Sequence, residues 1–141
     1  MFVLLSACAS DDNKKDTGSN EIDVKKEIAF QDFKATIDKV KVYEKDGAYL
    51  IDLPVKWLNL TEDKKMLMQV TGMDVEQSGE ILDEANNAWL SNEGEARIEN
   101  ASRGEWTADL TYELQNNNDP VKVTFVPLSG EESESITINI E

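Results

Sequence analysis

The 141-residue sequence contains no histidine and one cysteine, Cys8, and both scarcities limit its chemistry. Without histidine there is no Ser-His-Asp or Cys-His machinery, no imidazole general base and no histidine metal ligand. Basic residues are also scarce, because 14 Lys and Arg stand against 29 Asp and Glu, for a net charge of −15. Phosphate contacts are made largely by Lys and Arg, so we expect no nucleic-acid partner.

Long apolar runs are missing as well, since no segment approaches the 18 or more apolar residues of a transmembrane helix. The one short run, MFVLLSA, precedes Cys8. The order Leu5-Ser6-Ala7-Cys8 resembles the bacterial lipobox, in which a leucine and two small residues precede a lipid-modified cysteine. The run is short for a signal peptide and no Lys or Arg precedes it. We therefore expect residues 1–8 to be a signal-peptide remnant that directs lipidation of Cys8.

A flexible polar tether is predicted for residues 9–27. The stretch ASDDNKKDTGSN, from Ala9 to Asn20, has no large apolar residue and cannot bury enough surface to offset its ordering entropy. A cysteine with two acyl chains would hold the protein stably on a membrane, where one chain holds it only marginally. The expected location is the outer face of the bacterial cytoplasmic membrane. The alternative is that Cys8 is an ordinary thiol.

Apolar residues at every second position predict β-strands from about Ile28 onward. Asp46-Gly47 lies between two β-prone runs and predicts a hairpin that joins a strand over 33–43 to the next. Met66 to Val75 is a further strand candidate and Ala96 to Glu99 a weaker one. The clearest alternations are Tyr49, Ile51, Leu53, Val55 and Trp57; Trp106, Ala108, Leu110, Tyr112 and Leu114; Val121, Val123 and Phe125; and Ile136, Ile138 and Ile140.

About seven short strands without a helical stripe predict an antiparallel β-sandwich over residues 28–141. Trp57 and Trp106 lie in phase with their alternations, so both are predicted to be core residues. Residues 75–90 contain Gly79, Asn86 and Asn87 among apolar residues and are predicted to form a long structured loop. Such loops are uncommon in compact domains and often functional.

Three segments carry a family resemblance: Trp57-Leu58-Asn59-Leu60-Thr61, Gln77-Ser78-Gly79-Glu80-Ile81-Leu82, and Arg103-Gly104-Glu105 before a strand. Together with the lipobox and the tether, they resemble small immunoglobulin-like lipoprotein domains of Gram-positive bacteria, grouped as DUF4352-like and DUF5067-like. The resemblance covers roughly Ile28 to Glu141. It implies an immunoglobulin-like fold and a lipoprotein location. These domains have no established common activity, so the resemblance implies no function.

Carboxylates are the main reactive groups of the sequence. Glu76, Glu80, Asp83 and Glu84 form an acidic group on the predicted loop. Calcium takes six to eight oxygen ligands, but no Asp-x-Asp-x-Asp-Gly loop is present, so a solvated acidic surface is the favoured interpretation. Paired carboxylates can also hydrolyse glycosides if one has a raised pKa in an apolar cleft. The sequence shows no such cleft.

Two groups of side chains remain as candidates for binding. The thioethers of Met66, Met68 and Met73 could bind copper(I), but copper sites usually recruit His or Cys too, so these methionines are predicted to fill the core. Trp89 lies among loop-favouring residues, where it could stack on a sugar, cap a protein partner or cover the open end of the sandwich.

The sequence therefore predicts an all-β protein, an antiparallel immunoglobulin-like β-sandwich of about seven strands behind a lipobox and a disordered tether. We expect a non-catalytic binding or accessory module for a protein or cell-envelope partner, without cofactor or metal. Trp89, Glu80, Asp83 and Glu84 are the candidate partner-binding residues. The alternatives are a carboxylate-based cell-envelope hydrolase and a calcium-dependent adhesion or structural domain.

Overall fold

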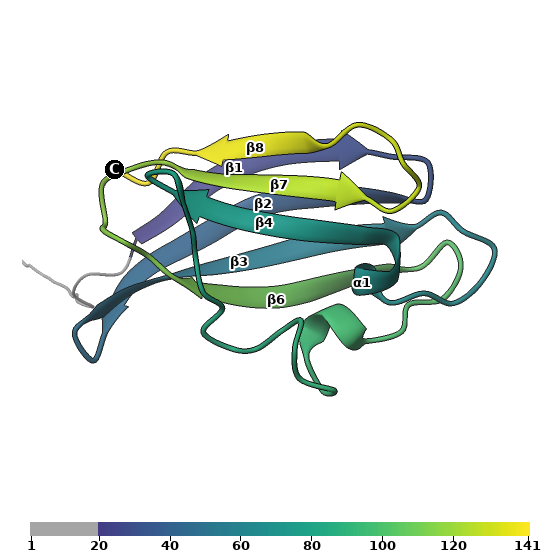
Figure 1. Ribbon diagram of the computed structural model, residues 1–141, viewed down its shortest axis with the longest axis horizontal. Coiled ribbons are helices and arrows are strands. Elements are labelled where there is room, and N and C mark those ends of the chain that lie inside the picture. Colours follow the sequence, from purple (N-terminus) through teal and green to yellow (C-terminus); the bar gives the residue numbers. More distant parts are fainter. Residues whose placement is uncertain (1–19) are drawn as a thin grey trace, which may run out of the picture.

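The computed structural model describes residues 20–141, which form two antiparallel four-stranded sheets that face each other (Figure 1). One sheet has the order β1 (Asn20–Ala29), β2 (Phe33–Lys45), β3 (Ala48–Asn59), β6 (Glu105–Glu113). The other has the order β5 (Glu80–Ile81), β4 (Thr71–Gln77), β7 (Val121–Pro127), β8 (Glu134–Ile138). A one-turn helix, α1 (Leu67–Val70), precedes β4, and a 3₁₀ helix, η2 (Glu95–Arg97), precedes β6. The predicted lipobox residues Leu5, Ser6 and Ala7 and the lipidation site Cys8 lie outside the described residues.

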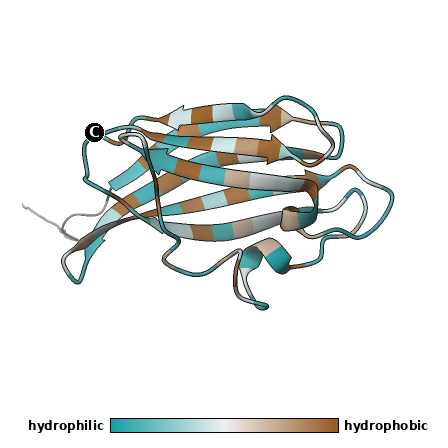
Figure 2. Ribbon diagram, viewed as in Figure 1, coloured by the Kyte–Doolittle hydropathy of each residue, from teal (hydrophilic) through white to brown (hydrophobic). Residues whose placement is uncertain are grey.

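The all-β prediction is confirmed, and the two facing sheets are compatible with a β-sandwich. Apolar and polar residues alternate along the strands in Figure 2. The inward residues of both sheets make one core, in which Trp57 and Phe125 are fully buried. The predicted hairpin turn is also confirmed, because Asp46 and Gly47 both have positive φ, the signature of a type I′ turn.

The predicted boundary between tether and domain is wrong, because the folded part includes β1 from Asn20 onward. β1 pairs with β2 along its length, so the backbone of residues 20–27 finds its hydrogen bonds in a sheet. Its only apolar residues before Ile28 are Ile22 and Val24, which are half-buried. Charged residues surround these two apolar residues, as is common on edge strands. The charged residues mask the alternation of apolar and polar positions in the sequence.

Three further sequence predictions need correction. Trp106 is 40% exposed rather than buried. It is the second residue of the edge strand β6, where neighbouring elements cover the sheet incompletely. The strand expected from Met66 begins only at Thr71, after α1. The weak strand expected from Ala96 is the helix η2 instead. No helix within residues 20–141 is long and apolar enough to cross a membrane.

Candidate binding groove

The predicted loop over 75–90 is in fact the end of β4, a tight turn, β5, and a segment that covers the outer edge of β6. Ser78 and Gly79 both have positive φ and close the β4–β5 turn. Residues 82–97, here called the edge-capping segment, then cross from β4 to β6. The Ala85 N–H donates to the Thr111 carbonyl at 2.7 Å, and the Glu113 N–H donates to the Asp83 carbonyl at 3.0 Å.

Side chains of the edge-capping segment complete the cover where its backbone leaves β6. Asn86 donates through Nδ2 to the Asp109 carbonyl at 2.9 Å and accepts the Thr111 N–H through Oδ1 at 3.3 Å. Glu95 Oε1 accepts the Asp109 N–H at 3.1 Å. An uncovered edge strand is a template for unwanted pairing, so these contacts protect the sheet.

The edge-capping segment is held in one shape by close internal contacts. Glu84 Oε1 accepts the Trp89 N–H at 2.9 Å, and Arg97 Nε donates to the Trp89 carbonyl at 2.9 Å. The Ala96 N–H donates to the Ala88 carbonyl at 3.1 Å. A Cβ on Gly94 would lie 2.2 Å from that same carbonyl oxygen, so only glycine fits there. The segment therefore presents Trp89 and Leu90 in fixed positions.

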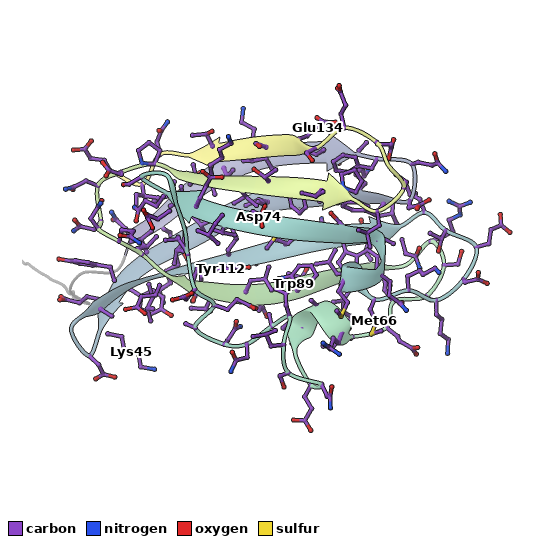
Figure 3. The ribbon with its side chains drawn as sticks, in the orientation of Figure 1. Lys45, Met66, Asp74, Trp89, Tyr112 and Glu134 are labelled. Atoms are coloured by element: carbon purple, nitrogen blue, oxygen red, sulfur yellow. The ribbon has the colours of Figure 1, made fainter. Side chains whose placement is uncertain are left out.

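A groove of about 510 Å³ lies between β4 and the edge-capping segment. Figure 3 labels three of its residues: Asp74 on β4, Trp89 on the edge-capping segment and Tyr112 on β6. Its volume falls in the range of ligand sites, about 300–1,000 Å³. The lining residues are Met73, Asp74, Val75, Ile81, Leu82, Asp83, Glu84, Asn87, Trp89, Leu90 and Tyr112.

The groove combines exposed apolar side chains with acidic ones. Ile81 is 61% exposed and Leu90 is 75% exposed, so both aliphatic side chains meet solvent beside the groove. Asp74, Asp83 and Glu84 add three carboxylates, and no Lys or Arg lines the groove. Burial, and secondly the charge of Glu84, raise the pKa of Tyr112 well above its ordinary value, so its hydroxyl stays protonated. The chemistry of the groove favours a ligand that is both cationic and apolar.

The structure brings three of the four predicted binding residues into this groove. Trp89, Asp83 and Glu84 line it, and Trp89 is half-buried against the core. Glu80 does not line it, because it lies on the exposed β4–β5 hairpin. Sequence reasoning missed Asp74 and Tyr112, which come from different sheets and have no local signal that joins them.

A second, smaller hollow of about 280 Å³ lies on the outer face of the β1–β2–β3–β6 sheet. There Asp52 accepts hydrogen bonds from the hydroxyls of Tyr43 at 2.8 Å and Thr111 at 3.0 Å. Burial and the bond to Asp52 raise the pKa of Tyr43 to about 12. Burial, then the charges of Glu95 and Asp52, raise the pKa of Asp109. Three carboxylates, Glu21, Asp52 and Asp109, therefore line this hollow, together with two lysines, Lys39 and Lys41.

A backbone irregularity produces this hollow. β2 has one extra residue opposite β3 between Thr36 and Lys41, a bulge that bends the sheet. Pro54 of β3 lies opposite the bulge on one side and pairs with Asp109 of β6 on the other. The Asp109 N–H is used by Glu95, away from β3, so the nitrogen of Pro54 faces the bulge. A proline inside a central strand is tolerated there, because the bulge interrupts the ladder that needs the missing donor.

The carboxylates of residues 20–141 form no group of three or more that could hold a metal ion. Of the acidic residues predicted on the loop, Glu84 holds the Trp89 backbone; Glu95, which lies beyond that loop, holds β6. The calcium hypothesis gains no support from this part of the chain. Met66, Met68 and Met73 are half-buried, and Met68 and Met73 pack against the core.

The sequence segments that carried the family resemblance have structural roles. Buried Asn59 donates to the carbonyls of Asp63 and Asn100, both at 2.9 Å, and accepts the Thr61 N–H at 2.9 Å. Asn100 in turn donates to the Gly104 carbonyl at 2.9 Å. The Trp-Leu-Asn-Leu-Thr and Arg-Gly-Glu segments thus meet at one end of the molecule.

Gln77 serves the opposite end in the same way. It is 1% exposed, and its Nε2 donates to the carbonyls of Asn116 at 3.0 Å and Asp119 at 2.8 Å. Its Oε1 accepts the N–H groups of Gln115 at 2.7 Å and Asn116 at 3.2 Å. Ser78 also bonds Asp119, and this hydroxyl, with Asn116, lowers the pKa of that carboxyl. One side chain therefore fixes the whole loop between β6 and β7.

Among the solved structures that resemble this fold are two of uncharacterised proteins. A conserved hypothetical protein from Bacillus anthracis, solved at 2.2 Å, matches with a TM-score of 0.61 and 14% identity over 86% of this chain and 99% of its own. A functionally unknown protein from Listeria monocytogenes EGD-e matches with a TM-score of 0.61 and 12% identity over 89% of this chain and 87% of its own. At such identities the likeness concerns the fold alone. Curated proteins give no match. The family model for the domain of unknown function DUF5067 matches residues 7–127, and this chain belongs to that family.

Proposed function

We propose that the protein is a non-catalytic binding or accessory module whose groove recognises a cationic partner. The observation that carries this proposal is the groove itself, in which Asp74, Asp83 and Glu84 accompany the exposed side chains of Ile81 and Leu90. A lysine or arginine side chain matches both features, because its aliphatic stem covers apolar surface while its charge meets the carboxylates. The net charge of −15 draws cationic partners toward the molecule from a distance.

We also propose a location and a fold type for the domain. It is an immunoglobulin-like sandwich that is anchored through Cys8 on the outer face of the bacterial cytoplasmic membrane. The sequence order Leu5-Ser6-Ala7-Cys8 supports the anchor. The partner would then be a protein or another component of the cell envelope. The acidic domain would stand off from anionic lipid, which leaves its groove available to that partner.

A defined peptide tests the groove. The acetylated octapeptide KVKVKVKV should bind the purified full chain in calorimetric titration, and EVEVEVEV should not, because its carboxylates meet those of the groove. The double variant Asp74→Asn/Asp83→Asn should weaken binding of the lysine peptide at least tenfold. The matched control is Glu132→Gln/Glu134→Gln, which removes the same charge around the exposed start of β8, outside the groove.

The two variants separate groove recognition from general attraction by the net charge. Equal weakening in both would mean that the total charge alone draws the peptide, and the groove assignment would fail. Equal affinity for the lysine and glutamate peptides would remove the proposed function itself.

Fractionation of cells tests the anchor. The chain should sediment with membranes, and Cys8→Ala should move it to the soluble fraction because the acyl attachment point is lost. A chain with Cys8→Ala that stays on membranes would refute lipid anchoring through this cysteine.

One observation favours the alternative of a carboxylate-based hydrolase. Asp52 and Asp109 share the outer hollow, and the pKa of Asp109 is raised. Such a pair is what glycoside hydrolysis requires, with one carboxyl protonated as the acid. However, Asp109 is exposed, and Asp52 already accepts two hydroxyl hydrogen bonds. Release of reducing ends from purified cell wall by the wild-type chain, lost in Asp52→Asn, would establish the hydrolase instead.

A further inference from the structure

The free edge of β4 forms one wall of the groove. On its inner side β4 pairs with β7 over its whole length, Thr71 to Gln77. On the other side β5 pairs only with Glu76 and Gln77. The Leu82 N–H then donates to the Val75 carbonyl at 2.8 Å, and the chain leaves the strand. From Thr71 to Asp74 no strand of the described chain pairs with β4 on this side.

The backbone of Met73 points to this open side. Residues of a strand alternate in the direction of their N–H and C=O groups, so Met73 faces the same way as Val75, two residues later. The Val75 carbonyl faces the edge-capping segment, since it accepts the Leu82 N–H. Met73 therefore offers a donor and an acceptor to the groove, side by side, which is the pattern that an added antiparallel strand uses.

The other edges of the two sheets are protected. The edge-capping segment covers β6. β1 and β8 lie beside each other (Figure 1), and β1 is interrupted by a bulge between Asp23 and Lys26. Bulges and charges are devices that prevent strand addition. Between Thr71 and Val75, by contrast, the register with β7 is continuous and Asp74 is the only charged residue.

We propose that the β4 edge binds an extended segment of a partner protein as an added antiparallel strand, and that this segment alternates cationic and apolar side chains. This rests on the proposed function and specifies its mode of recognition. Thr71 and Val75 are buried and Met73 is half-buried, whereas Asp74 between them is exposed. The apolar side chains of the added strand therefore face Trp89 and Leu90, and its cationic ones lie on the face of Asp74.

Charge selects this occupant over a second copy of the chain. Two copies joined edge to edge would bring together two molecules of charge −15 and two groups of groove carboxylates. A cationic strand meets the same carboxylates favourably. The alternation of side chains also predicts which amides of the peptide bond to β4. A valine opposite Met73 lies on the same face of the sheet as Met73 and exchanges both backbone hydrogen bonds with it.

Two methylated forms of KVKVKVKV test strand addition. In one, the valine amides are N-methylated, which removes the donors that face β4. In the other, the lysine amides are N-methylated, which leaves those donors in place. The valine-methylated peptide should bind at least tenfold more weakly than the parent, and the lysine-methylated peptide within about twofold of it. Equal affinities for the two would overturn strand addition, while binding of the parent peptide would still uphold the proposed function.

A variant of the protein tests the other side of the same bond. Met73→Pro removes only the N–H that faces the groove, so the ladder with β7 keeps its donors. It should bind the parent peptide at least tenfold more weakly, whereas Thr124→Ala on β7, outside the groove, should bind normally. Unchanged affinity in a folded Met73→Pro would overturn the proposal. If that variant does not fold, the methylated peptides decide alone.

Sedimentation of the full chain tests the competing occupant. A monomer at micromolar concentration that binds the parent peptide agrees with the proposal. A dimer that the peptide does not dissociate, and that Met73→Pro does dissociate, would show that the edge serves self-association instead.

Discussion

At the scale of single residues, two buried amides fix more of the molecule than any charged group does. Asn59 and Gln77 each bond four backbone or side-chain partners through one side chain. A buried polar group that loses its partner costs about 1–3 kcal/mol, so a side chain with several partners is hard to replace. The segments that resembled a known family therefore identify loop architecture, and this is why they indicated the fold without indicating an activity.

Gln77→Met tests this role. Methionine has a similar length, but it leaves two N–H groups and two carbonyls of the loop between β6 and β7 without their partner. We expect the free energy of unfolding to fall by about 2–4 kcal/mol, measured by denaturant titration. The control is Gln115→Met on the same loop, where the side chain is exposed and a change within about 0.5 kcal/mol is expected. Equal losses in both variants would contradict the role of the buried amide.

Asp109 should lower the stability of the fold at neutral pH more than at acidic pH. Its pKa is raised in the folded state above the ordinary value of 3.8, so folding favours the protonated carboxyl and the charged form costs stability at neutral pH. Asp109→Asn removes that cost. At pH 7.5 the variant should be more stable by less than about 1 kcal/mol, because the group is largely exposed.

The gain from Asp109→Asn should shrink as the pH falls toward the raised pKa, because the wild-type carboxyl then takes up its proton. Chemical denaturation at pH 7.5 and at pH 3.8, the ordinary pKa of the carboxyl, checks this. A gain that is the same at both pH values would show that removal of the proton-binding group is not its cause.

At the scale of elements, the sequence predicted strands well where apolar and polar residues alternate over a long run. It predicted them poorly at strand ends and sheet edges, where packing decides which residues are buried. The runs around Leu53, Leu110 and Val123 keep their period because both sheets cover them. Trp106 kept the period but lies at the end of an edge strand, where cover is incomplete. β1 escaped prediction because an edge strand needs few apolar residues, and the helix η2 because it depends on contacts with the rest of the edge-capping segment.

Only the part of the groove whose residues are close together in the sequence could be predicted. Trp89, Asp83 and Glu84 stand close together in the sequence, and loop-favouring neighbours identified that region as exposed. Asp74 and Tyr112 join it through the pairing of β4 with β7 and of β6 with β3, which depends on strand order. Strand order between two sheets leaves no trace in the local pattern of residues.

Gly94→Ala tests whether the edge-capping segment acts as one rigid element. The added methyl would lie within 3 Å of backbone atoms of both Asn87 and Ala88, so one side of the segment must move. We expect a loss of about 1–3 kcal/mol in stability, as for other overpacked sites, and weaker binding of KVKVKVKV because Trp89 and Leu90 shift. Gly72→Ala, whose new methyl makes only an ordinary contact with Val126 at 3.9 Å, should leave the stability unchanged. Melting and calorimetric titration measure stability and binding, and unchanged binding in Gly94→Ala would show that the groove tolerates movement of its wall.

At the scale of the whole molecule, the charge is placed on the domain that carries the groove. Residues 48–141 contain 19 acidic and 6 basic side chains, whereas residues 1–47 contain 10 and 8. The groove lies entirely in the more acidic part, since every one of its lining residues follows Gly72. The overall field and the local carboxylates thus act on a cationic partner in the same direction, the first at long range and the second at contact.

The separate roles of the net charge and the groove carboxylates predict how salt changes binding. The screening length falls from about 10 Å at 0.1 M salt to about 3 Å at 1 M, which removes long-range attraction and spares apolar contact. The affinity of KVKVKVKV should therefore fall at least tenfold between 0.05 and 0.5 M NaCl, mainly through a slower association rate in stopped-flow fluorescence. Asp74→Asn/Asp83→Asn should mainly speed dissociation, because it removes contacts within the groove. An affinity that is independent of salt would mean that apolar contact alone drives binding, and that the −15 charge has no part in recognition.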